Sequence, residues 1–198
     1  MIKKPRLAID FDDVLIRTAP VVMEHYNRTY GTSLQLADNY SADLDLWKAP
    51  SLDVVIERIE AFENSEEFCQ SVQPTSGAIA AIKELATFYE IHIITSRTPM
   101  LNEKTRHLID KFYSNAITEL HLVGISGNET GSKAELCKQL EIDTLVDDSI
   151  YNVADAVRTH IRAILFGNYP WNRVSDLPSF ISNPSNWSEA KNILLEEI

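Results

Sequence analysis

Cysteine is scarce in this sequence. Cys69 and Cys137 are the only two in 198 residues, and they form no CxxC pair. Disulfide-stapled domains and cysteine-based zinc sites need several closely spaced cysteines, so the sequence argues against both classes. Isolated thiols of this kind fit a reducing compartment, and we therefore expect a cytoplasmic protein.

Long hydrophobic runs are missing as well. No apolar stretch approaches the roughly 20 residues that a membrane-spanning helix requires. The chain begins MIKKPRLAID, where no long apolar segment follows the two lysines, so we expect no signal peptide there. This pattern predicts that the protein has no membrane partner.

Positive charge is in short supply. The chain has 18 Lys and Arg against 29 Asp and Glu, which gives a formal net charge of -11 at pH 7. Proteins that bind nucleic-acid polymers need a basic surface for the phosphates, so we do not expect such a partner. A small phosphorylated ligand remains compatible with this charge, because a single lysine and a metal ion can act locally.

What the sequence does contain is an ordinary globular composition, 44% apolar and 24% charged, in a length that fits one domain with a small insertion. Short apolar runs alternate with amphipathic stretches, which predicts strands alternating with helices. Thr18 is expected to cap the first helix, and residues 124–131 are expected to form a loop. The expected strands are 7–9, 91–94, 120–123, 145–146 and 161–166, and the expected helices are 18–30, 51–62, 78–88, 102–113, 133–140, 153–158 and 187–197.

This alternation predicts an α/β fold, a Rossmann-type parallel sheet with helices on both faces. Residues 16–73 are largely polar and helical in pattern, and they interrupt the alternation after the first strand. We therefore expect an α/β core of residues 1–15 and 74–198, and a small helical cap of residues 16–73.

The stretch RLAIDFDDVL at residues 6–15 places charged side chains directly after a buried strand. Side chains two apart on a strand point to one side, so Asp10 and Asp12 project together, with Phe11 opposite. Paired carboxylates repel each other unless a cation or a proton lies between them, which indicates a metal or proton-transfer site. Taken alone, the same residues and Asp13 fit a turn that caps the strand equally well.

In open parallel sheets, ligands bind outside the carboxyl ends of the strands, so the polar residues that follow apolar runs are the candidates for a site. Besides the aspartates after the first strand, three segments qualify: Thr95-Ser96-Arg97, Lys133 and Asp147-Asp148. The set fits phosphoryl transfer, with a carboxylate nucleophile, a second carboxylate for proton transfer, hydroxyl and lysine contacts to phosphate, and acidic ligands for Mg²⁺. Taken alone, Lys133 is better explained as a solvated lysine at a helix start, and its assignment depends on the set.

The ordered motifs DFDDVL, IHIITSR, SKAEL and LVDDS resemble the four motifs of the haloacid dehalogenase (HAD) superfamily. The resemblance covers roughly residues 5–166 and implies a HAD-like core with a cap inserted after the first strand. It implies Asp10 as the nucleophile and Asp12 as the acid/base, whereas spacing alone leaves these two roles interchangeable. Arg97 also fits pairing with a surface acid. The implied phosphate site comprises Thr95, Ser96, Arg97 and Lys133, and the implied Mg²⁺ site comprises Asp10, Asp12, Asp147 and Asp148.

Asp12 narrows the resemblance within the superfamily. Dehalogenases lack an acid at that position and P-type ATPases carry threonine there, so an aspartate resembles the phosphatase and phosphomutase branches. We expect a Mg²⁺-dependent phosphomonoesterase that works through an aspartyl-phosphate. The alternatives are a phosphatase or phosphotransferase acting on another small phosphorylated metabolite, and a weakly active binding protein of the same fold.

The cap carries a finer resemblance. Its string YNRTYGTSLQLADNYSADLDLW and the later YPWNR are similar to the cytosolic and mitochondrial deoxyribonucleotidases. This resemblance implies a 5'-nucleotidase acting on (deoxy)nucleoside monophosphates, with Trp47 and Tyr26 as candidate contacts to the nucleobase. The alternative is that these aromatic residues only pack the cap together. A homodimer is left open.

One near match is rejected. GNETGSK at residues 127–133 lies between an expected strand and an expected helix, as a phosphate-binding P-loop does. That motif needs its lysine directly after a glycine and a hydroxyl directly after the lysine, whereas here Ser132 intervenes and Ala134 follows. We therefore expect no ATP site of this type.

Overall fold

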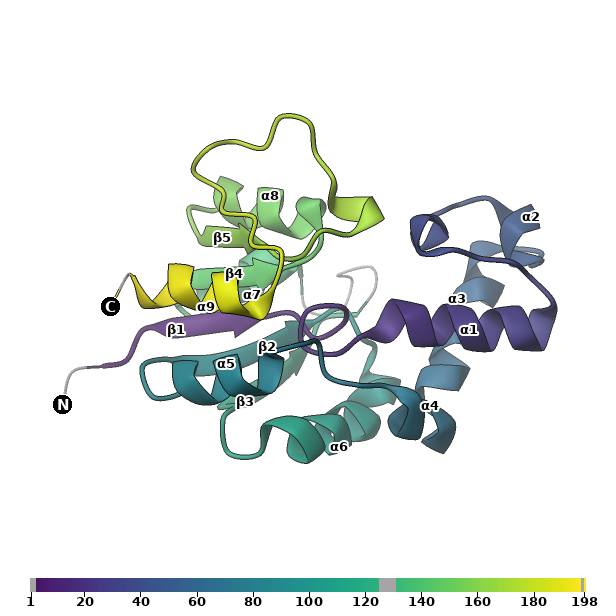
Figure 1. Ribbon diagram of the computed structural model, residues 1–198, viewed down its shortest axis with the longest axis horizontal. Coiled ribbons are helices and arrows are strands. Elements are labelled where there is room, and N and C mark those ends of the chain that lie inside the picture. The colour runs from purple at the N-terminus through teal and green to yellow at the C-terminus, as the bar shows by residue number, and fades with distance from the viewer. Residues whose placement is uncertain (1–2, 125–130, 197) are drawn as a thin grey trace.

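A computed structural model of the chain describes residues 3–124, 131–196 and 198. Its centre is a five-stranded sheet in the order β3-β2-β1-β4-β5, in which every pair of neighbouring strands is parallel (Figure 1). The predicted α/β architecture is thereby confirmed. The strands are β1 (Arg6–Ile9), β2 (Glu90–Thr95), β3 (Glu119–Leu122), β4 (Thr144–Asp147) and β5 (Arg162–Leu165).

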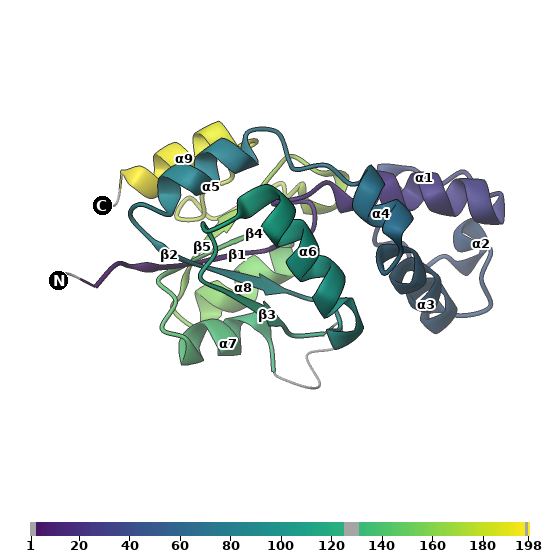
Figure 2. The ribbon, with the colours of Figure 1, turned by 90° about the horizontal axis from the view of Figure 1, so that it is seen from below.

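Helices cover both faces of this sheet (Figure 2). One face packs against α5, α6 and α9, and the other packs against α7 and α8. Most of the loop predicted at residues 124–131 lies outside the described residues. The core helices are α5 (Ala78–Leu85), α6 (Asn102–Tyr113), α7 (Lys133–Gln139), α8 (Ile150–Arg158) and α9 (Trp187–Leu195), with 3-10 turns η2 (Pro99–Leu101) and η3 (Pro170–Asn172).

The central strand β1 is buried on both faces, as its apolar sequence requires. Ile9 joins the hydrophobic cluster under α5, α6 and α9, whereas Ala8 faces the cluster under α7 and α8. Ile9 also pairs with Ile93 of β2 and Val146 of β4. The segments that follow these three strands therefore emerge together at one edge of the sheet.

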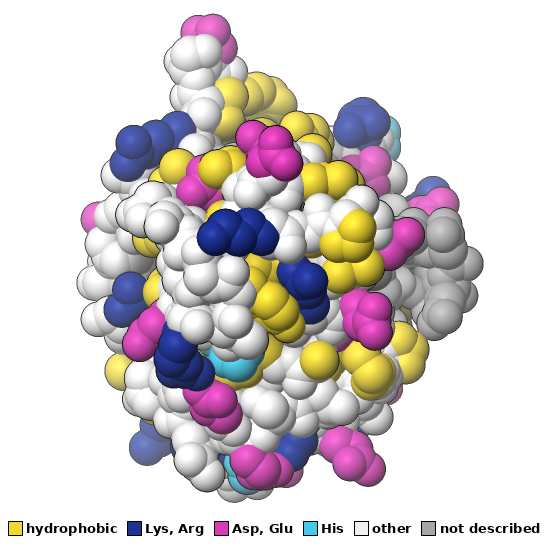
Figure 3. All heavy atoms as spheres, turned by 90° about the vertical axis from the view of Figure 1, so that its right-hand side faces the viewer, with side chains coloured by type: hydrophobic (Ala, Val, Ile, Leu, Met, Phe, Trp, Pro, Cys, Tyr) yellow, Lys and Arg dark blue, Asp and Glu magenta, His cyan; other side chains and the backbone are white. Residues whose placement is uncertain are grey.

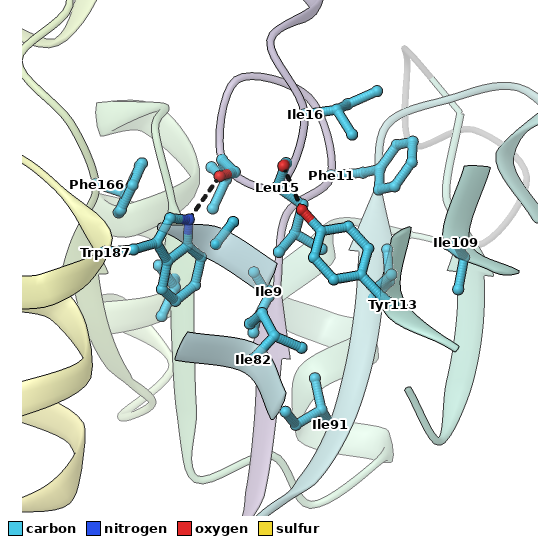
Figure 4. Close-up of a cluster of buried hydrophobic side chains, with 14 of the residues drawn as sticks. Ile9, Phe11, Leu15, Ile16, Ile82, Ile91, Ile109, Tyr113, Phe166 and Trp187 are labelled. Carbon is cyan, nitrogen blue, oxygen red and sulfur yellow. Dashed lines mark hydrogen bonds between the residues drawn. The ribbon is translucent and has the colours of Figure 1, made fainter. Parts of the chain in front are cut away.

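The turn after β1 is held by two aromatic donors from far along the chain (Figure 4). The Nε1 of Trp187, at the start of α9, donates to the Val14 carbonyl at 2.8 Å, and the hydroxyl of Tyr113, at the end of α6, donates to the Leu15 carbonyl at 2.5 Å. Both rings belong to the main hydrophobic cluster. Each ring therefore buries apolar area and also fixes the position of this turn.

Residues 16–73 leave the sheet between β1 and α5, and Figure 1 shows their helices beside the core, beyond the carboxyl ends of the strands. The two connecting segments pair with each other, because the Arg17 N–H donates to the Gln73 carbonyl at 2.9 Å. This insertion contains α1 (Thr18–Tyr30), the 3-10 turn η1 (Leu36–Asp38), α2 (Leu44–Trp47), α3 (Leu52–Glu63) and α4 (Glu66–Ser71).

The insertion packs partly on itself and partly on the core. Phe62 near the end of α3 and Phe68 of α4 join the main hydrophobic cluster of the core. The Lys111 Nζ of α6 donates to the Cys69 carbonyl of α4 at 2.9 Å. The rest of the insertion has its own small cluster of buried residues, made of Met23, Tyr26, Leu34, Trp47 and Val55.

The start of α1 differs from the sequence prediction. Thr18 is the first residue of the helix, and Arg17 before it makes no side-chain cap bond. The Asp13 carboxylate takes the capping role, because its oxygens accept the Ala19 N–H at 3.1 and 3.2 Å. The Thr18 hydroxyl is thereby left to donate to Asp12.

Two further observations concern the surface. Within the described part of the chain, no helix has the length and apolar content needed to cross a bilayer. The cap-side face intersperses basic, acidic and hydrophobic side chains (Figure 3).

Candidate active site

Three acidic residues meet at the carboxyl end of the sheet. Asp10 follows β1, whereas Asp147 ends β4 and Asp148 follows it. One carboxylate oxygen from each residue lies within 4.8 Å of the other two, and all three residues are buried. The structure thus brings together three of the four residues that the sequence assigns to a metal site.

Lys133, the first residue of α7, bridges two of these carboxylates. Its Nζ lies 2.7 Å from Asp10 Oδ1 and 2.7 Å from Asp147 Oδ2. The Ser132 hydroxyl caps α7 by accepting the Glu135 N–H at 3.2 Å, which fixes where the helix begins. Lys133 is 4% exposed, so it is a buried partner of the carboxylates and not a solvated helix-start lysine.

Asp147 and Asp148, at the end of β4, have different surroundings. Asp147 is fully buried, and besides Lys133 it accepts the Ser149 N–H at 2.9 Å and the Asn152 amide at 3.0 and 3.2 Å. Asp148 lines the cavity and accepts the Trp171 indole N–H at 2.6 Å. Protein donors therefore occupy both oxygens of Asp147, whereas Asp148 faces open space.

Asp12 is held apart from this cluster. Arg97 Nε lies 2.9 Å from Asp12 Oδ2 and Arg97 Nη2 lies 2.8 Å from Asp12 Oδ1, and the Thr18 hydroxyl donates to Oδ1 as well. The side chain of Asp12 is consequently not one of the three clustered carboxylates, unlike the sequence prediction. Arg97 is also placed differently, because it is buried and committed to the half-buried Asp12, so it is neither free for phosphate nor paired with a surface acid.

Thr95 is the last residue of β2 and Ser96 follows it, at the end of the sheet where the acidic cluster lies. Both line the cavity, with Thr95 buried and Ser96 half-buried. The Thr95 hydroxyl accepts the Arg97 N–H at 3.2 Å, which tightens the turn after the strand. These two residues remain candidates for phosphate contacts.

A cavity of about 410 Å³ lies between the carboxyl end of the sheet and the insertion. Helix α3 faces it with one stripe of side chains, and the Thr98 hydroxyl of the core donates to Glu60 Oε1 of this stripe at 2.8 Å. The cavity is thus closed on one side by the insertion. Its lining includes Asp10, Asp12, Thr95, Ser96, Arg97, Lys133 and Asp148 from the core, and Tyr40, Ile56, Ile59, Glu60 and Glu63 from the insertion.

The structure adds residues that sequence reasoning missed. Thr18, Glu63 and Asn152 line the cavity, and Trp171 holds Asp148. Of these residues, only Trp171 could have been found from the sequence, because it belongs to the YPWNR string that resembles the deoxyribonucleotidases. For the others no local pattern exists, since their positions depend on how α1, α3 and α8 pack.

Trp47 and Tyr26 do not contact the cavity. They are 3% and 1% exposed inside the insertion, where their rings meet edge to face with centroids 5.1 Å apart. The Trp47 indole donates to the Ser41 carbonyl at 2.9 Å, and the Tyr26 hydroxyl donates to the Trp47 carbonyl at 2.9 Å. The alternative that these aromatic residues pack the cap together is what the structure shows.

Burial and charge shift the acidic groups in opposite directions. Burial raises the pKa of Asp10 to about 7, although the Lys133 ammonium opposes the rise. Burial and then the charges of Asp10 and Asp147 raise the pKa of Asp148 well above its ordinary value. Burial also disfavours ionised Asp12, but the guanidinium of Arg97 outweighs it and lowers the pKa of Asp12. The clustered carboxylates therefore favour a bound cation, whereas Asp12 already has its own.

A second group of potential metal ligands lies on β2 and β3, where His92, Glu119 and His121 meet. His92 Nδ1 and His121 Nε2 are 3.1 Å apart, the ring planes differ by 17°, and the centroids are 5.4 Å apart. These values describe two nearly coplanar rings joined edge to edge by an N–H···N hydrogen bond. Their nitrogens then point at each other and not at a common ion, so we assign this pair to the packing of the sheet edge.

The chain was compared with family profiles, curated proteins and solved structures. Residues 4–197 match the profile of the family described as 5' nucleotidase, deoxy (pyrimidine), cytosolic type C protein. No protein in the curated set that we compared matches the chain.

Solved structures share its fold at low sequence identity. A predicted phosphatase from Clostridium acetobutylicum aligns with a TM-score of 0.71 and 12% identity, over 98% of this chain and 99% of that one. A haloacid dehalogenase-like hydrolase from Streptococcus pneumoniae aligns with a TM-score of 0.69 and 13% identity, over 98% and 100%. A Bacillus subtilis structure described as a HAD-hydrolase bound to magnesium aligns with a TM-score of 0.65 and 12% identity, over 98% and 99%.

These structural matches establish the HAD fold, and the profile match spans nearly the whole chain. The residues of the four motifs lie around one cavity at the carboxyl end of the sheet. The chain belongs to the family described as 5' nucleotidase, deoxy (pyrimidine), cytosolic type C protein, and it is a HAD-type hydrolase of phosphomonoesters.

Proposed function

We propose that this protein is a Mg²⁺-dependent 5'-nucleotidase that hydrolyses (deoxy)nucleoside monophosphates through an aspartyl-phosphate on Asp10, and that it acts in the cytoplasm. The observation that carries the mechanism is the pairing of Asp10 with Lys133 at the floor of the cavity, at 2.7 Å. The buried free thiols of Cys69 and Cys137 fit a reducing compartment. The family match supports the nucleotide as substrate.

The acidic cluster suits a hard cation. Its donors are carboxylate oxygens of Asp10, Asp147 and Asp148, the ligand type that Mg²⁺ prefers. We assign direct contact to Asp10 and Asp148, because protein donors already occupy both oxygens of Asp147. When bound, Mg²⁺ would neutralise the charge of the phosphoryl group and allow it to approach a carboxylate.

Asp10 supplies the nucleophile. Its Oδ1 is held by Lys133 and by the N–H of Phe11 at 2.8 Å, and no other hydrogen bond from the described residues reaches the carboxylate. Its other oxygen is therefore available to attack phosphorus. The oxygen–phosphorus bond to Asp10 forms while the phosphorus–oxygen bond to the leaving group breaks. The Lys133 ammonium lowers the pKa of Asp10 against the effect of burial and so favours the ionised form that this attack needs.

Asp12 moves the protons. In the first step, protonated Asp12 gives its proton to the leaving oxygen, and in the second its carboxylate takes a proton from the attacking water. That water releases inorganic phosphate and restores Asp10. Arg97 favours the carboxylate form of Asp12, which is the form that the water step needs. Thr95 and Ser96 line the same cavity as Asp10, and we assign their hydroxyls to the phosphoryl oxygens.

The test measures phosphate release from a panel of nucleoside 5'-monophosphates, deoxynucleoside monophosphates and sugar phosphates, with Mg²⁺ and with excess chelator. We expect activity that depends on Mg²⁺ and is greatest on nucleotides. Activity confined to sugar phosphates would contradict the nucleotidase assignment. Transfer of the phosphoryl group to an added alcohol in preference to water would instead indicate a phosphotransferase.

A further inference from the structure

The cations that line the cavity are already committed to carboxylates. Lys133 Nζ is shared by Asp10 and Asp147, at 2.7 Å from each. Arg97 holds both oxygens of Asp12. Among the described residues lining the cavity there is no other lysine or arginine, and the sequence of residues 125–130, ISGNET, contains none. Apart from the metal and the phosphate contacts, the cavity therefore offers no cation to a second anionic group.

The wall opposite the phosphate site is acidic. On α3, residues Ile56, Ile59, Glu60 and Glu63 share one face, because they are spaced three, four and seven apart, and all four line the cavity. Glu63 is 8% exposed, and it approaches Arg97 Nη2 only to 3.8 Å. No hydrogen bond from the described residues reaches its carboxylate. The leaving group thus meets apolar side chains and two carboxylates from α3.

Glu60 is oriented for a role in binding. Its Oε1 accepts the Thr98 hydroxyl at 2.8 Å, which ties the tip of this side chain to the core. No donor from the described residues reaches its Oε2, which is left to accept a bond from a ligand. Burial raises the pKa of Glu63 to about 7, opposed by the Arg97 guanidinium, and raises the pKa of Asp13 to about 8, so each of these two groups carries only part of its negative charge near neutral pH.

We infer that Glu60 and Glu63 make the leaving-group half of the cavity select against a second anionic group and in favour of an uncharged group that carries O–H or N–H donors. Phosphorylated carboxylic acids and bisphosphates would place a second negative charge against the α3 wall, with no cation to receive it. An uncharged alcohol or nucleoside can instead donate to Glu60 and lie against the isoleucines. This inference rests on the proposed function and identifies the residues that set its substrate class.

The test uses two non-hydrolysable phosphonates of the same chain length that differ at the far end, where one is an uncharged donor and the other is an anion. 3-Hydroxypropylphosphonate ends in a hydroxyl and 3-phosphonopropionate ends in a carboxylate, so both present the same group to the phosphate site. Binding to the Mg²⁺-loaded protein is measured by calorimetry. We expect the carboxylate analogue to bind at least about tenfold more weakly, which corresponds to about 1.4 kcal/mol.

Variants test whether the carboxylates of α3 cause the preference for the uncharged analogue. Glu60→Gln should reduce the ratio of the two dissociation constants by at least about threefold, because it keeps the shape and removes one charge. Glu57→Gln, exposed on the same helix and outside the cavity lining, should leave the ratio unchanged. Equal binding of both analogues, binding of neither, or an unchanged ratio in Glu60→Gln would overturn the inference. A preserved ratio in a protein without phosphatase activity would instead count against the proposed function alone.

Discussion

Arg97 grips both carboxylate oxygens of Asp12, with Nε 2.9 Å from Oδ2 and Nη2 2.8 Å from Oδ1. The guanidinium also lies over the rings of Phe11 and Phe68, with its carbon 5.1 and 5.4 Å from the two centroids. A planar fork of this kind fixes the direction of a carboxylate as well as its charge. The pair therefore sets where Asp12 can exchange protons, provided that Asp12 is the acid/base.

Replacing the Arg97 guanidinium by a lysine ammonium tests whether Arg97 orients Asp12 for proton transfer. Arg97→Lys keeps the charge but loses the two-bond geometry, so we expect kcat/KM for alkyl phosphates to fall by about tenfold or more. The fall should be much smaller for p-nitrophenyl phosphate, because its leaving group needs no proton. Arg106→Lys, at an exposed position on α6, is the control. Equal losses on both substrates would indicate that Arg97 contacts phosphate instead.

Removing the nucleophile should stop turnover without unfolding the protein. Asp10→Asn keeps the size of the side chain but cannot form the aspartyl-phosphate, so we expect kcat to fall by more than about 10³-fold. Circular dichroism should be unchanged. Asp53→Asn, an exposed first-turn residue of α3, should retain full activity. A substantial residual activity in Asp10→Asn would refute the covalent route.

Substitutions of Asp147 and Asp148, at the end of β4, should have different effects. Asp148→Asn removes the carboxylate that faces the cavity, so the Mg²⁺ concentration for half-maximal activity should rise by about tenfold or more. Asp147→Asn leaves Lys133 with one buried partner, so the free energy of unfolding should fall by roughly 3 kcal/mol. Metal titration and urea denaturation of both variants check this. The reverse pattern would show that Asp147 is the direct ligand.

Glu63 makes stability depend on pH. Burial raises its pKa from 4.5 to about 7 in the folded protein. The folded state therefore binds more protons than the unfolded state between these pH values, so this group lowers the free energy of unfolding as pH rises through that window. Glu63→Gln should stabilise the protein by roughly 1–3 kcal/mol at pH 8, and the gain should vanish near pH 4.5. Urea denaturation at both pH values measures this, and a gain independent of pH would contradict it.

The core of the site was predictable because it follows from backbone geometry. Parallel neighbouring strands end at one edge, so the residues at and just after the ends of β1, β2 and β4 are expected to lie together. Asp10, Thr95 and Asp148 occupy such positions. Lys133 was predicted only as part of the set, because one lysine at a helix start says nothing about burial.

The insertion was less predictable for the same physical reason. Its helices have no shared sheet to fix their orientation, so the faces that point inward depend on packing between distant segments. The sequence left open whether Trp47 and Tyr26 contact a ligand or pack the cap, and they fill the interior of the insertion. Glu60 and Glu63, which the sequence did not single out, line the cavity. The partner of Arg97 was hidden likewise, because 85 residues separate it from Asp12.

The hydrogen bond from Trp187 to Val14 also bears on when the enzyme becomes active during its synthesis. The donor is 173 residues away from the acceptor, although the acceptor lies in the turn that carries Asp10 and Asp12. A nascent chain that has emerged from the ribosome as far as β5 already contains every motif residue but lacks this bond. We expect the last helix to complete the turn, so that partly made chains do not hydrolyse cellular phosphate esters.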